Sequence, residues 1–389
     1  MGAPPYVELH AHSAFSFLDG ASAPEEMAGA AAEMGHEALA LTDHDGLCGS
    51  LAFAHAARAS GVRPITGAEL TLADGSHVTA LAESAAGYAN LCRLITRAHA
   101  GTRPPPDRRA RPPALDPREL GPRAEGLVFL TGCARHGVAA RHLAAGRPRE
   151  AERALRDLVG RVGRARVRVE LQRPRTRGDR RLARDLARLA EAAGLPCVAT
   201  GDPHAHDPRR AYLQDAFVAI QHRLTLDGSE DARRGNRSGV LRPPAETAAL
   251  FAEHPEAVAE TVRLAERLEF DLTRDLGYRF PDFAGSHPGE TAQEALARVC
   301  VHQLGARYPN AARRAAARAR LDEELALIAH HDLAGFFLLH RDILELAREV
   351  ALRVRPAGSA RRWLPPGRGR GSSVGSIVCY LIGLSHVDP

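Results

Sequence analysis

The sequence contains no lysine, and all 52 of its basic residues are arginine. This absence excludes a lysine nucleophile, a Schiff-base lysine and the lysine of a phosphate-binding loop. Together with the many alanine, glycine and proline residues, it is typical of a GC-rich coding bias. The net charge of +5 allows a polyanionic partner but does not identify one.

Paired cysteines and long apolar runs are also absent. The 6 cysteines are scattered and form no C-x-x-C pair, which is typical of reduced thiols in a cytoplasmic protein. No stretch approaches the roughly 20 apolar residues that cross a bilayer, and no signal peptide is apparent at the N-terminus. We therefore expect a cytoplasmic protein without a membrane segment, and 389 residues predict two domains.

Short apolar runs alternate with helical patterns over the first two hundred residues. The predicted strands are Val7–His10, Ala38–Thr42, Pro64–Leu70, His77–Leu81, Leu127–Thr131, Val167–Leu171 and Pro196–Thr200. The predicted helices are Ala23–Met34, Leu47–Ala59, Ala86–Ala100, Arg149–Val162 and Arg180–Ala193. This order predicts an α/β fold with a largely parallel sheet closed as a barrel. Only Ala73–Ser76 separates the third and fourth strands, so that link predicts a hairpin.

From Pro244 onward the pattern becomes helical. The predicted helices are Glu246–Ala252, Pro255–Arg267, Ala292–Gln303, Ala311–His330 and Leu339–Ala351. A break at Tyr278–His287 predicts a junction between a domain over residues 1–280, with a helical tail from about residue 244, and a second over 281–389. The stretches Gly101–Arg123 and Asp227–Ser238 are predicted as exposed loops. Because the chain ends just after the apolar run Val374–Leu384, we expect it to be truncated.

Potential metal ligands gather at the ends of the predicted strands. Alternation along a strand puts His10 and His12 on one face. The ends of barrel strands are where functional groups meet, and imidazole, carboxylate and thiolate bind zinc, manganese and iron. The candidates, called the ligand set below, are His10, His12, Asp19, His44, Glu69, His77, Cys133, Asp202 and His204. They are too many for one ion, and two or three metals about 3.5–4 Å apart would suit hydrolysis of phosphate esters.

Each of these residues also has a structural interpretation when it is taken alone. A histidine at a strand end is more often hydrogen-bonded than metal-bound, Asp19 before Gly20 is a common turn former, and Cys133 fits a buried thiol. Asp43 would hold its loop, and Glu69 would pair with one of the arginines. The repetition of such residues at successive strand ends favours the metal site. His36, His55, His99, His136, His142, His206 and His222 lack that placement and are predicted to be surface or structural residues.

The ligand set closely resembles that of the polymerase and histidinol phosphatase (PHP) family of metal-dependent phosphoesterases. The resemblance implies a distorted seven-stranded barrel around a trinuclear site, with the nine residues of the ligand set as its ligands. It also implies bound zinc, manganese or iron and a phosphoesterase or 3′→5′ exonuclease activity.

The C-terminal part resembles the start of the palm domain of bacterial C-family DNA polymerases, in the segments Phe336–Asp342 and Pro365–Val378. Residues 15–22, 204–207 and 384–389 resemble the error-prone branch more than the replicative alpha subunit. A Gly/Ser-rich loop that leads into a helix offers backbone N–H groups to a phosphate, although on spacing alone it would be a flexible basic loop. The resemblance implies that this loop binds a nucleotide through Arg368, Arg370, Gly371, Ser372, Gly375 and Ser376.

The resemblance implies DNA and deoxynucleoside triphosphates as partners of the whole protein, with magnesium for polymerisation. A sliding clamp and other translesion proteins are further expected partners. Because the catalytic aspartates of this family lie beyond the Gly/Ser segment, this chain alone is not expected to polymerise DNA. The alternatives are a free-standing phosphatase for a small ester such as histidinol phosphate, the replicative alpha subunit, and a PHP domain that is only a structural support.

Overall fold

The computed structural model describes residues 5–102, 111–277, 289–359, 367 and 369–389. The chain divides into two compact units, Met1–Leu276 and Gly277–Pro389. The predicted junction at Tyr278–His287 lies outside the described residues. Within the described residues, no helix is both long enough and apolar enough to cross a membrane.

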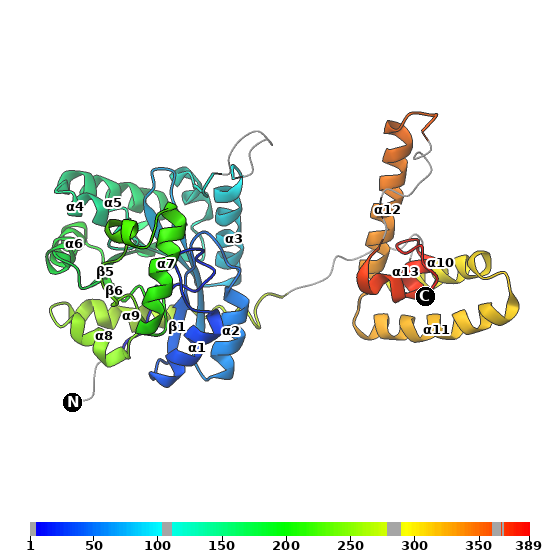
Figure 1. Ribbon diagram of the computed structural model, residues 1–389, viewed down its shortest axis with the longest axis horizontal. Coiled ribbons are helices and arrows are strands. Elements are labelled where there is room, and N and C mark those ends of the chain that lie inside the picture. The colour runs from blue at the N-terminus through cyan, green and yellow to red at the C-terminus, as the bar shows by residue number, and fades with distance from the viewer. Residues whose placement is uncertain (1–4, 103–110, 278–288, 360–366, 368) are drawn as a thin grey trace. The chain divides into compact units, whose positions relative to one another are not determined.

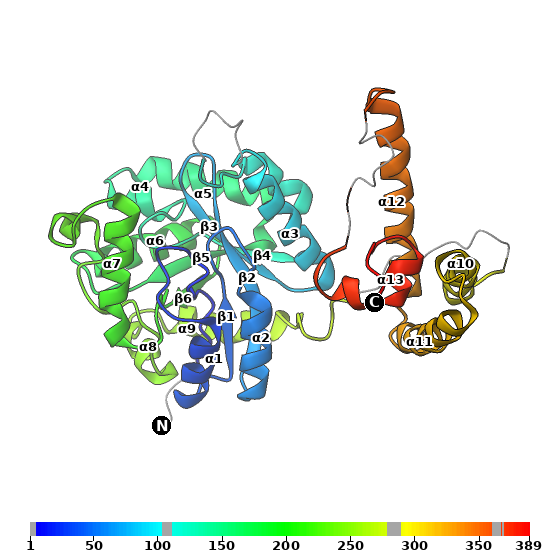
Figure 2. The same cartoon turned by 45° about the vertical axis from the view of Figure 1, so that its right-hand side comes forward.

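The first unit is built on a six-stranded sheet whose strands follow one another in chain order (Figures 1 and 2). Its strands are β1 (Ala38–Leu41), β2 (Arg63–Thr71), β3 (His77–Ala82), β4 (Leu127–Leu130), β5 (Val167–Gln172) and β6 (Cys197–Thr200). Strand β3 is antiparallel to both β2 and β4, and the other neighbours are parallel. The predicted hairpin between β2 and β3 is therefore confirmed.

The first predicted strand, Val7–His10, is not assigned as a strand; it makes an isolated bridge between Glu8 and Leu39 of β1. Its backbone N–H groups donate to side chains instead of a neighbouring strand: that of Val7 to Thr261 Oγ1 and that of His10 to Glu8 Oε1, both at 3.1 Å. A regular ladder needs those donors, so its expected hydrogen-bond pattern is broken. The described sheet therefore has six strands where seven were predicted.

Helices cover the sheet as the apolar spacing predicts. In α6 the buried residues Ala183, Leu186 and Ala190 recur every three or four positions, and this face packs on β5. The helices of the first unit are α1 (Pro24–Glu33), α2 (Ser50–Ala59), α3 (Ala85–His99), α4 (Ala140–Ala144), α5 (Pro148–Val162), α6 (Asp179–Ala193), α7 (Ala211–His222), α8 (Pro244–Leu250) and α9 (Pro255–Arg267). Helices α4 and α7 were not predicted from the sequence.

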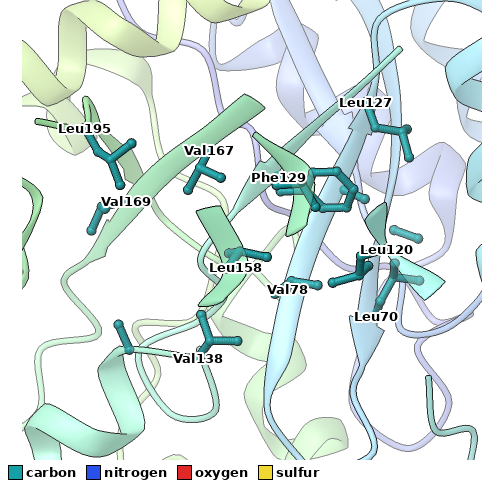
Figure 3. Packing of buried hydrophobic residues seen from close by; sticks show 14 of the residues in the cluster. Leu70, Val78, Leu120, Leu127, Phe129, Val138, Leu158, Val167, Val169 and Leu195 are labelled. Carbon is teal, nitrogen blue, oxygen red and sulfur yellow. The ribbon is translucent and has the colours of Figure 1, made fainter. Parts of the chain in front are cut away.

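Both faces of the sheet are buried, which explains why strands such as β1 and β4 are continuous apolar runs. In β4, Leu127 and Phe129 belong to the large cluster drawn in Figure 3, while Val128 and Leu130 belong to a second cluster. The alternation follows from the two-residue repeat of a strand. Helix α9 packs on β6 and contributes Leu264 to the second cluster.

Two segments predicted as exposed loops are partly built into the fold. Of Gly101–Arg123, the described part includes Leu115 and Leu120, which lie in the core. Residues 227–238 begin with the short 3₁₀ helix Asp227–Ala232 and continue to Arg234, which contacts the ligand set. Polar and proline-rich composition indicates a loop but does not show which of its side chains turn inward.

The second unit is a helical cluster of α10 (Ala292–Arg307), α11 (Ala311–His330), α12 (Ala334–Val354) and α13 (Ile377–Leu381). Thr291 caps α10 in a capping box with Glu294, whose carboxylate accepts the Thr291 N–H at 2.9 Å. Helix α10 packs against the other three helices around an apolar core that includes Leu296, Leu321 and Leu338.

Candidate metal centre

The N-terminal segment and β6 bring one corner of the ligand set together. The Nε2 atoms of His10 and His12 lie 3.0 Å apart, so both side chains point the same way as alternation predicts. Asp202 follows β6, and its Oδ1 lies 3.3 Å from His12 Nε2. From the end of β2, Glu69 Oε2 lies 3.5 Å from the same nitrogen. All four side chains are buried or nearly so.

Glu69 joins this corner to the rest of the ligand set. Its Oε2 lies 3.2 Å from His44 Nδ1, and its Oε1 lies 3.1 Å from His77 Nδ1. Because β3 runs antiparallel to β2, its first residue, His77, returns beside Glu69. Cys133 follows β4, and its Sγ lies 3.9 Å from the same His77 nitrogen.

Asp19 completes the cluster from the loop between the first segment and α1. Its Oδ2 lies 3.3 Å from His44 Nε2 and 2.9 Å from His204 Nε2. The structure therefore links every member of the ligand set in one continuous cluster.

The donor atoms fit divalent metal ions. Three groups have ligand atoms within 4.8 Å of one another: His12, His44 and His204; His10, His12 and Asp202; and His44, Glu69 and His77. Among the described residues, the buried oxygens Glu69 Oε1 and Asp202 Oδ1 accept no hydrogen bond. Their polar neighbours include the imidazole nitrogens of His77 and His12, at 3.1 and 3.3 Å, in a geometry that makes no hydrogen bond, and a cation would satisfy both oxygens.

Buried hydrogen bonds orient the histidines. Glu170 of β5 accepts from His10 Nδ1 at 2.7 Å, which turns Nε2 toward the cluster. His12 Nδ1 pairs with Ser16 Oγ at 3.0 Å, and Ser16 Oγ donates to Asp43 at 2.7 Å. Such outer partners fix ring orientation in metal sites. Asp43 also accepts from Ser13, so it holds this loop as its structural interpretation predicts.

Burial and neighbouring charges set the protonation of the cluster. Burial, with His204 and His44 close by, lowers the pKa of His12 to about 3, so its imidazole is neutral and able to ligate. Burial also disfavours the charged form of His44, but Glu69 and Asp19 outweigh it and raise its pKa to about 9. A metal that takes this ligand would therefore release a proton.

Several residues at the site were not predicted. Arg234 Nη2 lies 3.2 Å from Asp19 Oδ1 and also contacts His204 Nε2. The ring of His136, which was predicted to be a surface or structural residue, packs on His77 with centroids 4.9 Å apart. Glu8 and Glu170 are buried beneath the histidines. Glu8 and Glu170 could have been found as carboxylates inside predicted apolar strands. The loop sequence around Arg234 contains no pattern that predicts its contact with the cluster.

A cavity of about 570 Å³ adjoins the cluster and shares Asp202 and Arg234 with it. Its wall also carries Arg135, Arg177 and Arg181, and cavities of this size are typical of small-molecule sites. Arginines beside a metal cluster suit a substrate that carries phosphate.

The predicted nucleotide-binding segment lies in the second unit, at the N-terminus of α13. Arg370 is described and Gly371–Gly375 forms a 3₁₀ turn, but Arg368 lies outside the described residues. Glu324 of α11 accepts hydrogen bonds from Ser376 Oγ at 2.7 Å and from the Ile377 N–H at 2.9 Å. Ser372 and Gly375 lie in the preceding turn. A triphosphate at this helix end would have to displace Glu324, and the nucleotide site stays a prediction.

Glu324 should stabilise the second unit. Glu324→Ala leaves the Ser376 hydroxyl and the first N–H groups of α13 without this acceptor, which we expect to cost about 1–3 kcal/mol of unfolding free energy. Chemical denaturation of the chain measures the loss. Glu323→Ala, at the exposed neighbouring position, is the matched control and should change the free energy by less than about 0.5 kcal/mol. Equal losses in the two variants would show that the capping contact contributes nothing.

Family models match both parts of the chain. Residues 8–174 match the PHP domain, and residues 294–389 match the model described as the bacterial DNA polymerase III alpha NTPase domain. The chain therefore carries a PHP domain followed by a polymerase alpha-subunit region.

Nearly the whole chain is similar to error-prone DNA polymerases. That of Mycolicibacterium paratuberculosis is 38% identical over 397 residues, which cover 99% of this chain and 34% of the relative. That of Symbiobacterium thermophilum is 35% identical over 401 residues, which cover 98% of this chain and again 34% of the relative. The chain thus spans about a third of the length of these relatives and corresponds to their N-terminal part. The predicted resemblance to the error-prone branch is confirmed.

The solved structure of an amidohydrolase from Chromobacterium violaceum, with bound sulfate and no metal, is similar to part of this chain, and the match covers 51% of this chain and 88% of the amidohydrolase chain. Its TM-score is 0.39 and its sequence identity is 18%.

Proposed function

We propose that the first unit is a metal-dependent phosphoesterase that removes nucleotides from the 3′ end of DNA and forms part of an error-prone, translesion DNA polymerase. The observation that carries the proposal is the buried cluster in which the whole ligand set is linked by contacts, with two carboxylate oxygens that accept no hydrogen bond among the described residues. The similarity to error-prone DNA polymerases supports DNA as the substrate.

The ligand set of the proposed site would hold two or three ions of zinc, manganese or iron. Bound metals would supply a hydroxide nucleophile at neutral pH and neutralise the charge of the phosphoryl oxygens. The chain's own residues act around them. Glu170 and Ser16 hold His10 and His12 with their Nε2 atoms toward the cluster. Arg234 lies beside Asp19, where its guanidinium would contact a phosphate oxygen of the substrate.

For the chain as a whole we propose a PHP domain over residues 1–280, including the helical tail from about residue 244, and the start of a palm domain over 281–389. The segment Val7–His10 would serve as the seventh strand of a distorted barrel, between β1 and β6. Support comes from the hydrogen bonds of Ala40 N–H to the Glu8 carbonyl and of Gly201 N–H to the Glu8 side chain.

The whole protein would bind DNA, deoxynucleoside triphosphates and magnesium in the cytoplasm and work with a sliding clamp and other translesion proteins. Polymerisation itself would need residues beyond those of this chain.

A phosphatase for a small ester such as histidinol phosphate is the second candidate, because the adjoining cavity of about 570 Å³ would accommodate such a molecule. Purified chain with manganese is incubated in parallel with 3′-labelled single-stranded DNA and with histidinol phosphate. We expect release of mononucleotides from the DNA. Release of inorganic phosphate from histidinol phosphate alone would favour the second candidate, and no turnover despite bound metal would mean that the metal only stabilises the domain.

A further inference from the structure

Two phenylalanines are exposed on the loop that carries Asp19 into the metal centre. Phe17 is 77% exposed, the largest value for any large apolar side chain among the described residues, and Phe15 is 37% exposed. Their ring centroids lie 6.4 Å apart in an edge-to-face pair. An exposed aromatic pair presents an apolar surface that a binding partner can cover.

Hydrogen bonds and close backbone contacts define the turn that exposes Phe17. The N–H groups of Asp19 and Gly20 both donate to the Ser16 carbonyl, at 3.0 and 2.9 Å. Leu18 takes a left-handed φ of 61°, a conformation that residues with side chains rarely adopt. A Cβ at Gly20 would lie 1.8 Å from the Ser13 carbonyl oxygen, so the loop closes only around a glycine.

The chain on both sides of Phe17 contacts the metal centre. Ser16, just before it, contacts His12 Nδ1 at 3.0 Å, and Asp19, two residues after it, contacts His44 and His204. The strained turn thus directs the Asp19 side chain toward the cluster and leaves the Phe17 side chain exposed to solvent. Backbone strain of this kind is typical of functional sites.

An arginine contacts the same loop, and a helix that packs on the loop carries a further exposed ring. Arg234 contacts Asp19 at 3.2 Å. Helix α7, which lies beside the loop in Figure 2, contacts it through Gln214 Nε2 and the Asp19 carbonyl at 3.1 Å. The same helix exposes Tyr212, and the Arg237 guanidinium lies over that ring at 4.3 Å. Exposed rings interleaved with arginines are the pattern with which proteins bind single-stranded nucleic acid.

We propose that Phe17, supported by Phe15, is a stacking platform for a base of single-stranded DNA whose 3′ end enters the metal centre. The proposal rests on the proposed function and names its substrate as single-stranded. Bases inside a duplex are stacked on both faces and present neither face to a ring, and an ester as small as histidinol phosphate needs no platform outside the cluster. Single-stranded DNA offers an unpaired base to the apolar ring and phosphates to the arginines.

Binding is measured by fluorescence anisotropy of a labelled single-stranded oligodeoxythymidine at fixed salt with the full chain. Stacking of one base predicts that Phe17→Ala weakens the affinity roughly 5- to 150-fold. Phe17→Trp should restore it, and Phe17→Leu, which keeps an apolar side chain without a ring, should not. Leu276→Ala removes an exposed apolar side chain outside the loop and α7 and should leave the affinity unchanged.

Native affinity in Phe17→Ala, or native affinity in Phe17→Leu, would overturn the stacking platform. So would an equal loss of affinity for a blunt duplex of the same charge. Circular dichroism and metal content establish that each variant is folded, and Phe17→Leu keeps the test valid if the alanine variant is not. The measurement needs no turnover, so a chain that binds through Phe17 but cleaves nothing would refute the nuclease and leave the platform standing.

Discussion

Substituting His12 and Glu69 by alanine together should reduce bound metal to background while the first unit stays folded. His12 belongs to two of the three groups of potential ligands, and Glu69 belongs to the third, so the pair of substitutions disrupts all of them. Burial raises the pKa of Glu69, but His44 and His10 outweigh it and hold that pKa well below its usual value, so the ionised carboxylate stabilises the metal-free fold at neutral pH. The variant should therefore unfold at a temperature below that of the metal-stripped native chain. Elemental analysis and thermal unfolding measure the two effects.

The matched control is His55→Ala with Glu191→Ala, which removes the same two side-chain types from exposed positions of α2 and α6. It should retain the metal content of the native chain. Full metal content in the His12 and Glu69 variant would contradict the assignment of the ligand set, since no group would keep all its ligands.

The second large effect is expected at Gly132, in the turn between β4 and Cys133. Gly132 has a φ of +85°, and a Cβ there would lie 2.2 Å from the His77 carbonyl oxygen. Gly132→Ala must therefore move backbone that carries two members of the ligand set. We expect a loss of about 3 kcal/mol or more of unfolding free energy, from a left-handed alanine and the collision combined. Metal affinity should fall as well, because the His77 and Cys133 donors move.

Gly146→Ala separates the two causes of this loss. Gly146 has a similar φ of +71°, but a Cβ there would meet no atom within 4 Å. Gly146→Ala should therefore lose only the unfolding free energy that a left-handed alanine costs, about 1–2 kcal/mol, and should not change metal affinity. Urea denaturation and calorimetric titration with manganese compare the variants. If Gly132→Ala lost no more stability than Gly146→Ala, the close contact between the turn and β3 would be absent.

Much of the α/β architecture could be predicted from the sequence because the strands are buried on both faces. A continuous apolar run such as Leu127–Leu130 predicts a buried strand from the local sequence alone. The link Ala73–Ser76 is too short for a crossover and therefore predicts a hairpin. Helix α7 was missed because apolar residues occur all around it and several remain exposed, so its pattern defines no single buried face. The first segment looked like a strand, but long-range bonds to side chains such as Thr261 interrupt its ladder.

The candidate site was predictable to the extent that its residues follow strands directly. His44 and Glu69 lie at or just after strand ends, and the order of the strands alone brings them within 3.2 Å. Arg234 reaches the cluster from a loop whose path is set by tertiary packing, and no local pattern encodes that path. Glu170 lies inside β5, and only the folded arrangement of β5 and the first segment makes its carboxylate a partner for His10.

The most direct test of the metal centre is a crystal structure of the chain grown with manganese, with diffraction data collected above and below the manganese absorption edge. We predict anomalous peaks inside the cluster, one of them among His44, Glu69 and His77 and another beside His12 and Asp202. Well-ordered ligand-set side chains without any anomalous peak among them would contradict the account, whatever activity the chain displayed.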